Sequence, residues 1–199
     1  MTKAPLPFRV LVITDWALGN EELLRRLALA LRAGKGLAVQ HRHPGAVDRQ
    51  FFDEAVRVKQ VCDAAGAPLF VNSRLDVALA VGAHLHCTSH SLPPRELRQL
   101  LPDRWISCVV HAKGDDVEGA DLALVSPVFP PRSKPDDTRP PLGAAGFETL
   151  AATLPCPAFA LGGIDATTAG SLSGAGVAVI SGVLHAADPE AATRALLNL

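Results

Sequence analysis

The sequence predicts one compact (β/α)8 barrel of the TIM type, a single domain over residues 1–199. Eight short apolar segments occur along the chain, and most are followed by a segment with helical periodicity. The apolar segments do not alternate with charged residues, which predicts strands buried on both faces, as in a parallel sheet. An open doubly wound sheet is the alternative, but it would not need eight strands.

The predicted strands are rich in Val, Leu, Ile and Ala. They cover residues 10–14, 37–41, 69–72, 83–87, 106–110, 122–126, 158–161 and 177–181.

The predicted helices are marked by residues typical of helix ends. Segment 20–34 begins at a plausible N-cap, Asn20, and a second helix runs from 48 to Gly66. Shorter helices follow the third strand, over 75–81, and the fourth, where the prolines lie in the first turn. Asp165 and Asp188 are predicted N-caps of the last two helices. After the fifth strand, the predicted helix over residues 115–119 is very short.

Composition excludes several classes of partner. The net charge of −1 gives no general attraction to nucleic acid or membrane. No long apolar segment opens the chain, and the uncharged segment 166–187 is rich in Gly, Ser and Thr, which mark turns rather than a membrane span. Four cysteines, far apart and without a C-x-x-C pair, fit buried thiols in a reducing cytoplasm. We therefore expect a cytoplasmic protein, and a homodimer on general grounds.

The ends of the last two strands carry small residues, in the stretches "LGGID" and "VISGV". In a (β/α)8 barrel the active site lies at the carboxyl ends of the strands, and the loops after strands seven and eight commonly bind phosphate. We therefore predict phosphate binding through the backbone N–H groups of Gly162, Gly163, Ser181 and Gly182. The alternative is that small residues only allow tight turns.

Polar residues follow three other strands. Gln40 and Arg42 share one face of the second strand, and an inward Arg42 would meet an anion, although it could equally be solvated beyond the strand end. Asn72 would hydrogen-bond a substrate, or cap the next helix. His111 stands one residue past the fifth strand, where an imidazole could move a proton at neutral pH.

Two further groups of residues are candidates for ligand or metal binding. The long proline-rich loop after strand six holds three cations and a hydroxyl that suit an anion: Arg132, Ser133, Lys134 and Arg139. Five histidines, at positions 41, 43, 84, 86 and 90, could in principle hold zinc, but their spacing matches no standard ligand set. We therefore predict no metal site, and the sequence gives the histidines no shared purpose.

Taken in order, eight pieces of the chain resemble one family. They are "VLVITD", "VQHR", "LFVNSRLDVALAVGA", "LHCTSHSLP", "VVHA", "VSPVFPPRSK", "PAFALGGI" and "GVAVISGV". The chain is similar over nearly its whole length to the thiamine phosphate synthase and TenI superfamily of small barrels. The resemblance implies one of two reactions. Synthases join a pyrimidine diphosphate to a thiazole phosphate with Mg2+ held by acidic residues, whereas tautomerases of the TenI type move a proton on a thiazole carboxylate phosphate with a histidine.

The chain departs from the synthase pattern at the positions that the resemblance assigns to the diphosphate and the metal. Pro44 stands where the pattern has lysine, Asn72-Ser73 replaces Asn-Asp, and His90-Ser91 replaces an acidic pair. Hydroxyls and imidazoles substitute poorly for the carboxylates that Mg2+ prefers. By contrast, the loops after strands seven and eight match, and His111 occupies the position of the TenI-type histidine.

These departures favour a metal-independent thiazole tautomerase, an isomerase without a cofactor. His111 would shuttle the proton, Ser133 and Lys134 would support the phosphate, and Gln40, Arg42 and Asn72 would orient the carboxylate and ring. A divergent Mg2+-dependent thiamine phosphate synthase, a transferase, is the first alternative. The second is a non-catalytic barrel that binds a phosphorylated thiazole or thiamine phosphate.

Overall fold

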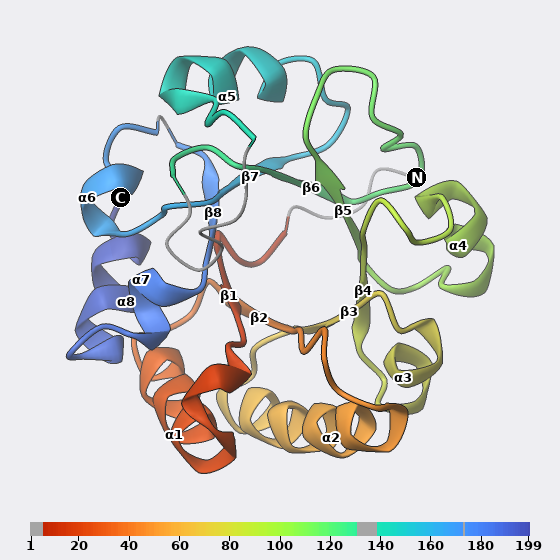
Figure 1. Ribbon diagram of the computed structural model, residues 1–199, viewed down its shortest axis with the longest axis vertical. Coiled ribbons are helices and arrows are strands. Elements are labelled where there is room, and N and C mark those ends of the chain that lie inside the picture. Colours follow the sequence, from red (N-terminus) through yellow and green to blue (C-terminus); the bar gives the residue numbers. More distant parts are fainter. Residues whose placement is uncertain (1–5, 131–138, 173) are drawn as a thin grey trace.

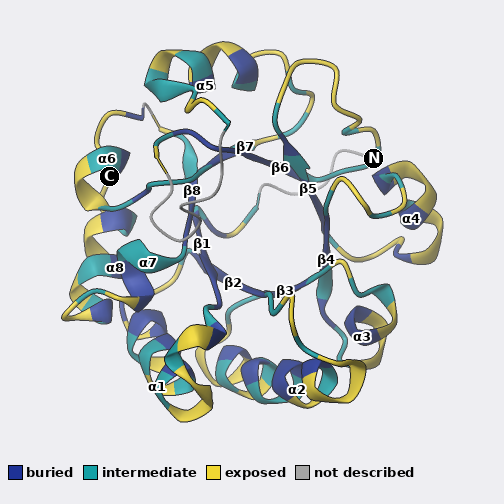
Figure 2. Cartoon of the chain, viewed as in Figure 1, coloured by how far each residue is buried: buried dark blue, intermediate teal, exposed yellow. Residues whose placement is uncertain are grey.

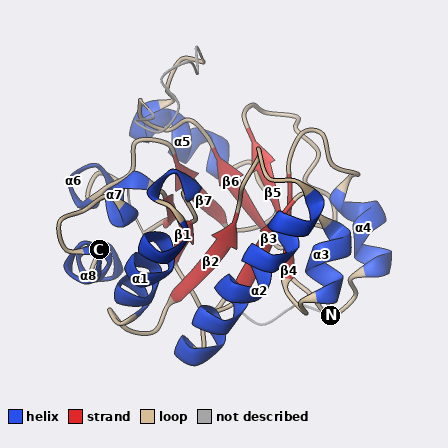
Figure 3. Cartoon of the chain, turned by 60° about the horizontal axis from the view of Figure 1, so that its bottom comes forward, coloured by secondary structure: helices blue, strands red, loops and turns tan. Residues whose placement is uncertain are grey.

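The computed structural model describes residues 6–130, 139–172 and 174–199. Eight parallel strands form a closed barrel in chain order, β1 to β8, with β8 paired to β1. Helices surround the barrel, so the predicted (β/α)8 fold is confirmed (Figure 1). Because every pair of neighbouring strands is parallel, their carboxyl ends meet at one end of the barrel (Figure 3).

The strands lie close to their predicted positions. Their bounds are β1 Val10–Ile13, β2 Leu37–His41, β3 Leu69–Asn72, β4 His84–Cys87, β5 Ile106–Val110, β6 Leu122–Val125, β7 Ala158–Leu161 and β8 Gly176–Val179.

The described helices are α1 Asn20–Leu31, α2 Asp48–Ala65, α3 Leu75–Ala80, α4 Pro94–Leu100, α5 Gly143–Ala151, α6 Ala166–Ala169, α7 Ser181–Leu184 and α8 Pro189–Leu197, with a 3-10 turn, η1, at Trp16–Leu18.

Four helix ends or helices differ from the sequence prediction. Gly19, with a φ of 80°, is the N-cap of α1, and Asn20 is already helical. α5 was not predicted, and Ser181 begins α7 instead of ending β8. Residues 115–119 form no helix. The predicted caps at Asp165 and Asp188 are confirmed, since each carboxylate accepts hydrogen bonds from backbone N–H groups of its helix.

Two separate apolar cores explain why the strands are buried on both faces (Figure 2). Val10 and Val12 point outward into the layer between strands and helices, whereas Leu11 and Ile13 point into the barrel. Phe8, just before β1, closes the amino end of the barrel against Phe70, Trp105 and Phe159, at ring centroid distances of 5.8, 5.8 and 5.6 Å. Access to the interior is therefore from the carboxyl ends of the strands.

The cysteines are thiols in an apolar environment. Cys62, Cys87 and Cys108 are buried, and burial raises the pKa of each to about 12. Such thiols are protonated and unreactive at neutral pH. Within the described residues, no helix is long and apolar enough to cross a membrane.

Candidate active site

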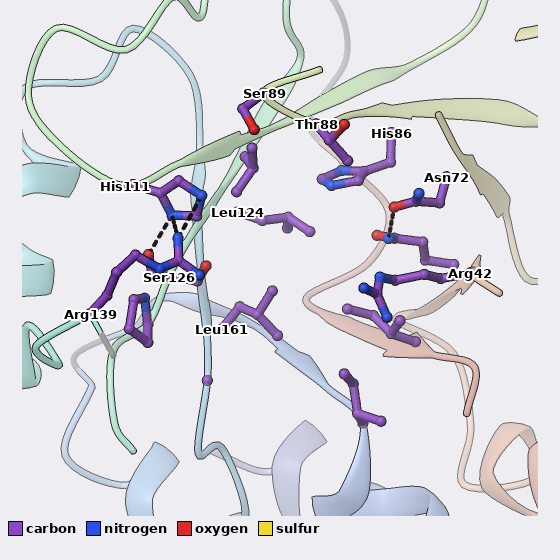
Figure 4. Close-up of a pocket in the computed structure, with 16 residues that line it drawn as sticks. Arg42, Asn72, His86, Thr88, Ser89, His111, Leu124, Ser126, Arg139 and Leu161 are labelled. Atoms are coloured by element: carbon purple, nitrogen blue, oxygen red, sulfur yellow. Dashed lines mark hydrogen bonds between the residues drawn. The ribbon is translucent and has the colours of Figure 1, made fainter. Parts of the chain in front are cut away.

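A cavity of about 210 Å³ lies at the carboxyl ends of the strands (Figure 4). Its polar lining comes from residues at or just beyond the ends of five strands: Gln40, Arg42, Asn72, His86, Thr88, Ser89, His111 and Ser126, together with Arg139. Apolar residues such as Ile13, Leu124 and Leu161 form its floor and wall. The cavity therefore lies where catalytic residues of such barrels come together.

The alternation of β2 places its residues as predicted. Gln40 and Arg42 line the cavity, while His41 and His43 lie on the opposite face against α2. The backbone at Arg42 is fixed by Thr14, whose Oγ1 accepts from the Arg42 N–H at 2.8 Å and donates to its carbonyl oxygen at 3.1 Å. The two sides of this strand end thus face different environments.

A directed chain of hydrogen bonds crosses the ends of β2, β3 and β4. Gln40 Nε2 donates to Asn72 Oδ1 at 3.2 Å, and Asn72 Nδ2 donates to Ser73 Oγ at 3.0 Å. Ser73 Oγ lies 3.3 Å from Thr88 Oγ1. Asn72 thus holds the amide of Gln40 rather than capping α3, whose N-cap is Arg74.

Gln40 has one polar atom left over. Its side chain is buried, with 2% of the residue exposed, and Oε1 has no hydrogen-bond partner among the described residues. A buried carbonyl oxygen without a donor is costly, so the site is built to receive an N–H or O–H group from a ligand.

Arg42 supplies a positive charge to the same side of the cavity. Its side chain makes no ion pair or hydrogen bond with the residues that the structure describes, and it points into the cavity (Figure 4). Burial lowers the pKa of this guanidinium, and the charge of Asp15 opposes the shift. A guanidinium stays charged in proteins, so Arg42 is a half-buried cation suited to an anionic ligand.

His111 and Arg139 face Arg42 from the other side of the cavity (Figure 4). His111 Nδ1 lies 2.7 Å from the carbonyl oxygen of Ser126, which can only accept, so Nδ1 carries the proton. Arg139 Nη1 lies 2.5 Å from Nδ1 and 2.7 Å from Nε2 of His111, so the guanidinium lies against both ring nitrogens. His111 is therefore held between the Ser126 carbonyl and the Arg139 guanidinium.

His86 is the neutral member of the cavity wall. It is buried, and Nδ1 lies 2.9 Å from Ser107 Oγ. Burial, with a smaller contribution from the charge of Arg42, lowers the pKa of His86 to about 3. At neutral pH its imidazole is thus an uncharged hydrogen-bonding group.

The two glycines of "LGGID" are required by packing. Gly162 and Gly163 have φ values of 98° and 62°, which glycine adopts without strain. Segment 127–130 lies directly over them, because Phe129 N–H donates to the Gly162 carbonyl at 3.0 Å and a Cβ on Gly163 would lie 2.7 Å from the Pro130 carbonyl oxygen. The backbone N–H groups of Gly162, Gly163 and Ile164 have no acceptor among the described residues, so a turn built by packing also leaves donors available.

The predicted phosphate residues are only partly brought together. Gly162 lines the cavity, but Gly163, Ser181 and Gly182 do not. Gly182 packs against the Ile164 carbonyl, where a Cβ would overlap the oxygen atom. Ser133 and Lys134, like Arg132, lie outside the described residues.

The five histidines are distributed over separate environments. His41 and His43 lie outside the barrel near Glu54, and Trp16 stacks on His43 with ring centroids 5.5 Å apart. His84 packs between Phe70 and Trp105. His90 is exposed. Only His86 among them lines the cavity.

A magnesium ion, which the resemblance implies, does not fit the donors that the structure describes. No carboxylate lines this cavity in the described part of the chain, and no cluster of three metal-ligating side chains occurs there. The oxygens of Asn72, Ser73, Thr88 and Ser91 are hydrogen-bonded to one another or to their neighbours. Mg2+ prefers charged oxygen ligands and an open octahedral shell, which these groups do not offer.

Several cavity residues were not singled out as site residues from the sequence. Ser126 and Thr88 end or follow strands, and Ser89 follows Thr88 in the loop, positions that would have identified them had every strand end been read equally. From the sequence, His86 is a candidate zinc ligand and Arg139 is one of three cations in the loop after the sixth strand. The contact of Arg139 with His111 joins residues 28 positions apart and has no local sequence signal.

Comparisons with known proteins agree on the family. The family model described as thiamine monophosphate synthase matches residues 10–185. The thiamine-phosphate synthase of Salinispora arenicola is 38% identical, with 96% of each chain covered, and that of Chloroflexus aurantiacus is 33% identical, over 96% of this chain and 92% of the relative. The solved thiamine phosphate pyrophosphorylase of Pyrococcus furiosus superposes with a TM-score of 0.82 at 29% identity, covering 96% of this chain and 94% of that one.

The prediction of a thiazole tautomerase is wrong. Full-length relatives at 33–38% identity carry the name thiamine-phosphate synthase, and the similar solved structure is named a thiamine phosphate pyrophosphorylase. The few replaced positions favour the tautomerase branch, but the similarity to synthases extends over residues 10–185 and outweighs them. His111 and the glycine turns fit either branch, so they could not decide between the two. The chain belongs to the thiamine monophosphate synthase family.

Proposed function

We propose that this protein is a thiamine-phosphate synthase, a transferase that joins a pyrimidine diphosphate to a thiazole phosphate. The observation that carries the proposal is that one cavity holds the Arg42 guanidinium and Gln40 Oε1, neither of which has a partner among the residues that the structure describes. One group suits a phosphate and the other suits the N–H donor of a heterocycle, and the first substrate carries both kinds of group. The name carried by the relatives supports the same reaction.

Gln40 and Asn72 orient the pyrimidine. Asn72 Oδ1 fixes Gln40 Nε2 at 3.2 Å, which leaves Oε1 directed to the ligand. The hydrogen bonds from Asn72 to Ser73 and on to Thr88 hold that arrangement. A preorganised acceptor positions the ring without losing side-chain freedom on binding.

Arg42 binds the diphosphate. In the coupling step a bond forms from the thiazole phosphate to the pyrimidine substrate while the bond to the diphosphate breaks, and the diphosphate leaves as pyrophosphate with the bonding electron pair. Negative charge grows on the departing oxygen, and a fixed guanidinium in a partly buried site stabilises it.

The turn after β7 binds the phosphate of the second substrate. The N–H groups of Gly162, Gly163 and Ile164 have no acceptor among the described residues and follow the strand end that lines the cavity. The predicted contributions of Ser181, Gly182, Ser133 and Lys134 to that phosphate remain part of this proposal. His111 is a positioning residue that holds Arg139 at the cavity wall.

A coupling assay on charge-matched variants tests the proposal. Arg42→Met removes the cavity guanidinium, whereas Arg49→Met removes an exposed one that pairs with Asp53 on α2. We expect kcat/KM for product formation to fall about 10- to 100-fold in the first variant, the loss of one charge-assisted contact, and to stay unchanged in the second. Equal activity of both variants would remove Arg42 from the site, and a wild type without coupling activity would refute the function.

A further inference from the structure

The cavity differs from a metal-dependent diphosphate site in the sign of its charges. Two guanidiniums, Arg42 and Arg139, line it from opposite sides, and no carboxylate does so among the residues described. A divalent cation entering this space would meet positive charge without the anionic ligands that offset its dehydration. A diphosphate, which is an anion, would instead be attracted by the two guanidiniums.

Three carboxylates follow nearby strands, and each has partners. Asp116, in the loop after β5, accepts from the Glu118 N–H at 3.1 Å and lies 3.5 Å from Arg95 Nη1. Asp15, after β1, bonds His185 Nε2 at 2.8 Å and caps Ala17 N–H at 3.2 Å. Asp115, in the loop after β5, accepts from the backbone N–H groups of His111 and Ala112 at 2.6 and 3.1 Å. Their hydrogen bonds hold local turns, so these carboxylates fix the backbone around the cavity.

Hydroxyls occupy the positions that the family resemblance assigns to acids. Ser91 Oγ accepts a hydrogen bond from the Thr88 N–H at 3.0 Å, and Ser73 Oγ accepts one from Asn72 Nδ2 at 3.0 Å. Both serines therefore belong to the hydrogen-bonded chain that orients Gln40. The serine hydroxyls hold the rim of the cavity through hydrogen bonds and add no negative charge to it.

We infer that this protein binds the diphosphate group with its arginines in place of a carboxylate-held divalent cation, so that neither pyrophosphate binding nor coupling requires Mg2+. The inference rests on the proposed function for the identity of the ligand. The positive charge that a metal would supply comes from Arg42, with Arg139 on the facing wall.

Calorimetric titration with pyrophosphate tests the binding part without any turnover. The wild type is titrated once with EDTA and once with excess Mg2+. We expect dissociation constants that agree within about threefold. Binding that is more than about tenfold tighter with Mg2+, or that occurs only with it, would overturn the inference, as would no binding in either condition.

Restoring acids at the rim gives a matched pair of variants. The double variant Ser73→Asp with Ser91→Asp adds carboxylates, and Ser73→Asn with Ser91→Asn adds side chains of the same size without charge. Ser73 has a φ of 61°, a conformation in which Asp and Asn are the best tolerated side chains after glycine. We expect the Asp pair to bind pyrophosphate at least about tenfold more weakly in EDTA and to recover with Mg2+, while the Asn pair stays insensitive to the metal.

A coupling assay in the same two buffers separates the two proposals. Product formed at similar rates with EDTA and with Mg2+ supports both. Product formed only with Mg2+ overturns the inference and leaves the synthase function standing. No product in either buffer, together with pyrophosphate binding in EDTA, refutes the synthase function and leaves the metal-free anion site.

Discussion

Both faces of β2 and of the two residues that follow it carry polar side chains, but the faces differ in how many of these side chains have partners within the protein. On the outer face, His43 Nδ1 lies 2.8 Å from the buried carboxylate of Glu54, and His41 Nε2 donates to the Phe51 carbonyl at 3.1 Å. His41 Nδ1 has no partner among the described residues, but it lies outside the cavity. On the inner face, Gln40 keeps an acceptor without a partner and Arg42 has no ion pair among the described residues. Polar groups that satisfy each other stabilise a fold, whereas polar groups left unsatisfied in a cavity indicate a ligand. This difference predicts that outer substitutions affect stability and inner ones affect binding.

The largest effect on stability is expected from Glu54→Ala. Glu54 is 3% exposed and accepts from Gln50 Nε2 at 2.9 Å, while His43 Nδ1, on a side chain that is 25% exposed, lies 2.8 Å from it. Its loss removes both contacts and leaves the half-buried imidazole without its acceptor, so we expect the free energy of unfolding to fall by about 2–3 kcal/mol. Its neighbour Asp53 forms an exposed ion pair with Arg49, its sole charged partner in the described part of the chain, so Asp53→Ala should cost less than about 0.5 kcal/mol. Denaturant titrations of the two variants measure the difference. Equal losses of stability would show that the contacts of Glu54 on the outer face do not stabilise the fold.

The outer face should also make stability depend on pH. Burial lowers the pKa of His41 from 6.5 to about 4, so between these values the unfolded chain binds a proton that the folded chain does not. The free energy of unfolding therefore falls as the pH falls from 6.5 to 4, by about 3 kcal/mol from His41.

The variant pair His41→Gln and His90→Gln isolates this contribution. Glutamine at 41 can still donate to the Phe51 carbonyl, but it does not titrate, whereas His90 is exposed. Unfolding measured across this pH range should show a shallower slope for His41→Gln and the wild-type slope for His90→Gln. Identical slopes in all three proteins would show that His41 does not carry the dependence.

A smaller effect is expected at the turn after β8. A Cβ on Gly182 would overlap the Ile164 carbonyl, whereas a Cβ on Gly45 would meet no atom within 4 Å. Gly182→Ala should therefore lower the free energy of unfolding by about 1–3 kcal/mol through overpacking. Gly45→Ala should leave it within about 0.5 kcal/mol of the wild type. A Gly182→Ala variant as stable as the wild type would show that the turn accommodates the added methyl group and that packing does not require glycine here.

The smallest change in stability is expected from Arg42→Met. The backbone at this position is fixed by Thr14, and the guanidinium contacts no protein partner among the described residues. We expect a free energy of unfolding within about 0.5 kcal/mol of the wild type, although coupling activity falls. A strongly destabilised variant would show that Arg42 belongs to the structure rather than to the ligand site.

The sequence predicted the barrel well because its signals are local. Strand segments, the caps at Asp165 and Asp188, and the two faces of β2 follow from hydrophobic patterning and turn chemistry. α5 was missed, as its sequence, GAAGFETLA, has two glycines and no side-chain cap.

The site was harder to predict, since its decisive features join distant residues. The contact of Arg139 with His111, the bond from Gln40 to Asn72 and the packing of segment 127–130 on Gly163 depend on the closed barrel. The reaction was predicted wrongly because single replaced acids carry less information than the match along the whole chain.

The most direct test of this account is a coupling assay on the wild-type protein with the pyrimidine diphosphate and the thiazole phosphate together, and with each omitted in turn. We expect pyrophosphate to be released only when both substrates are present, in an amount equal to that of a product with the mass of thiamine phosphate. No product, or pyrophosphate release from the pyrimidine substrate alone, would contradict the assignment of this cavity to thiamine-phosphate synthesis.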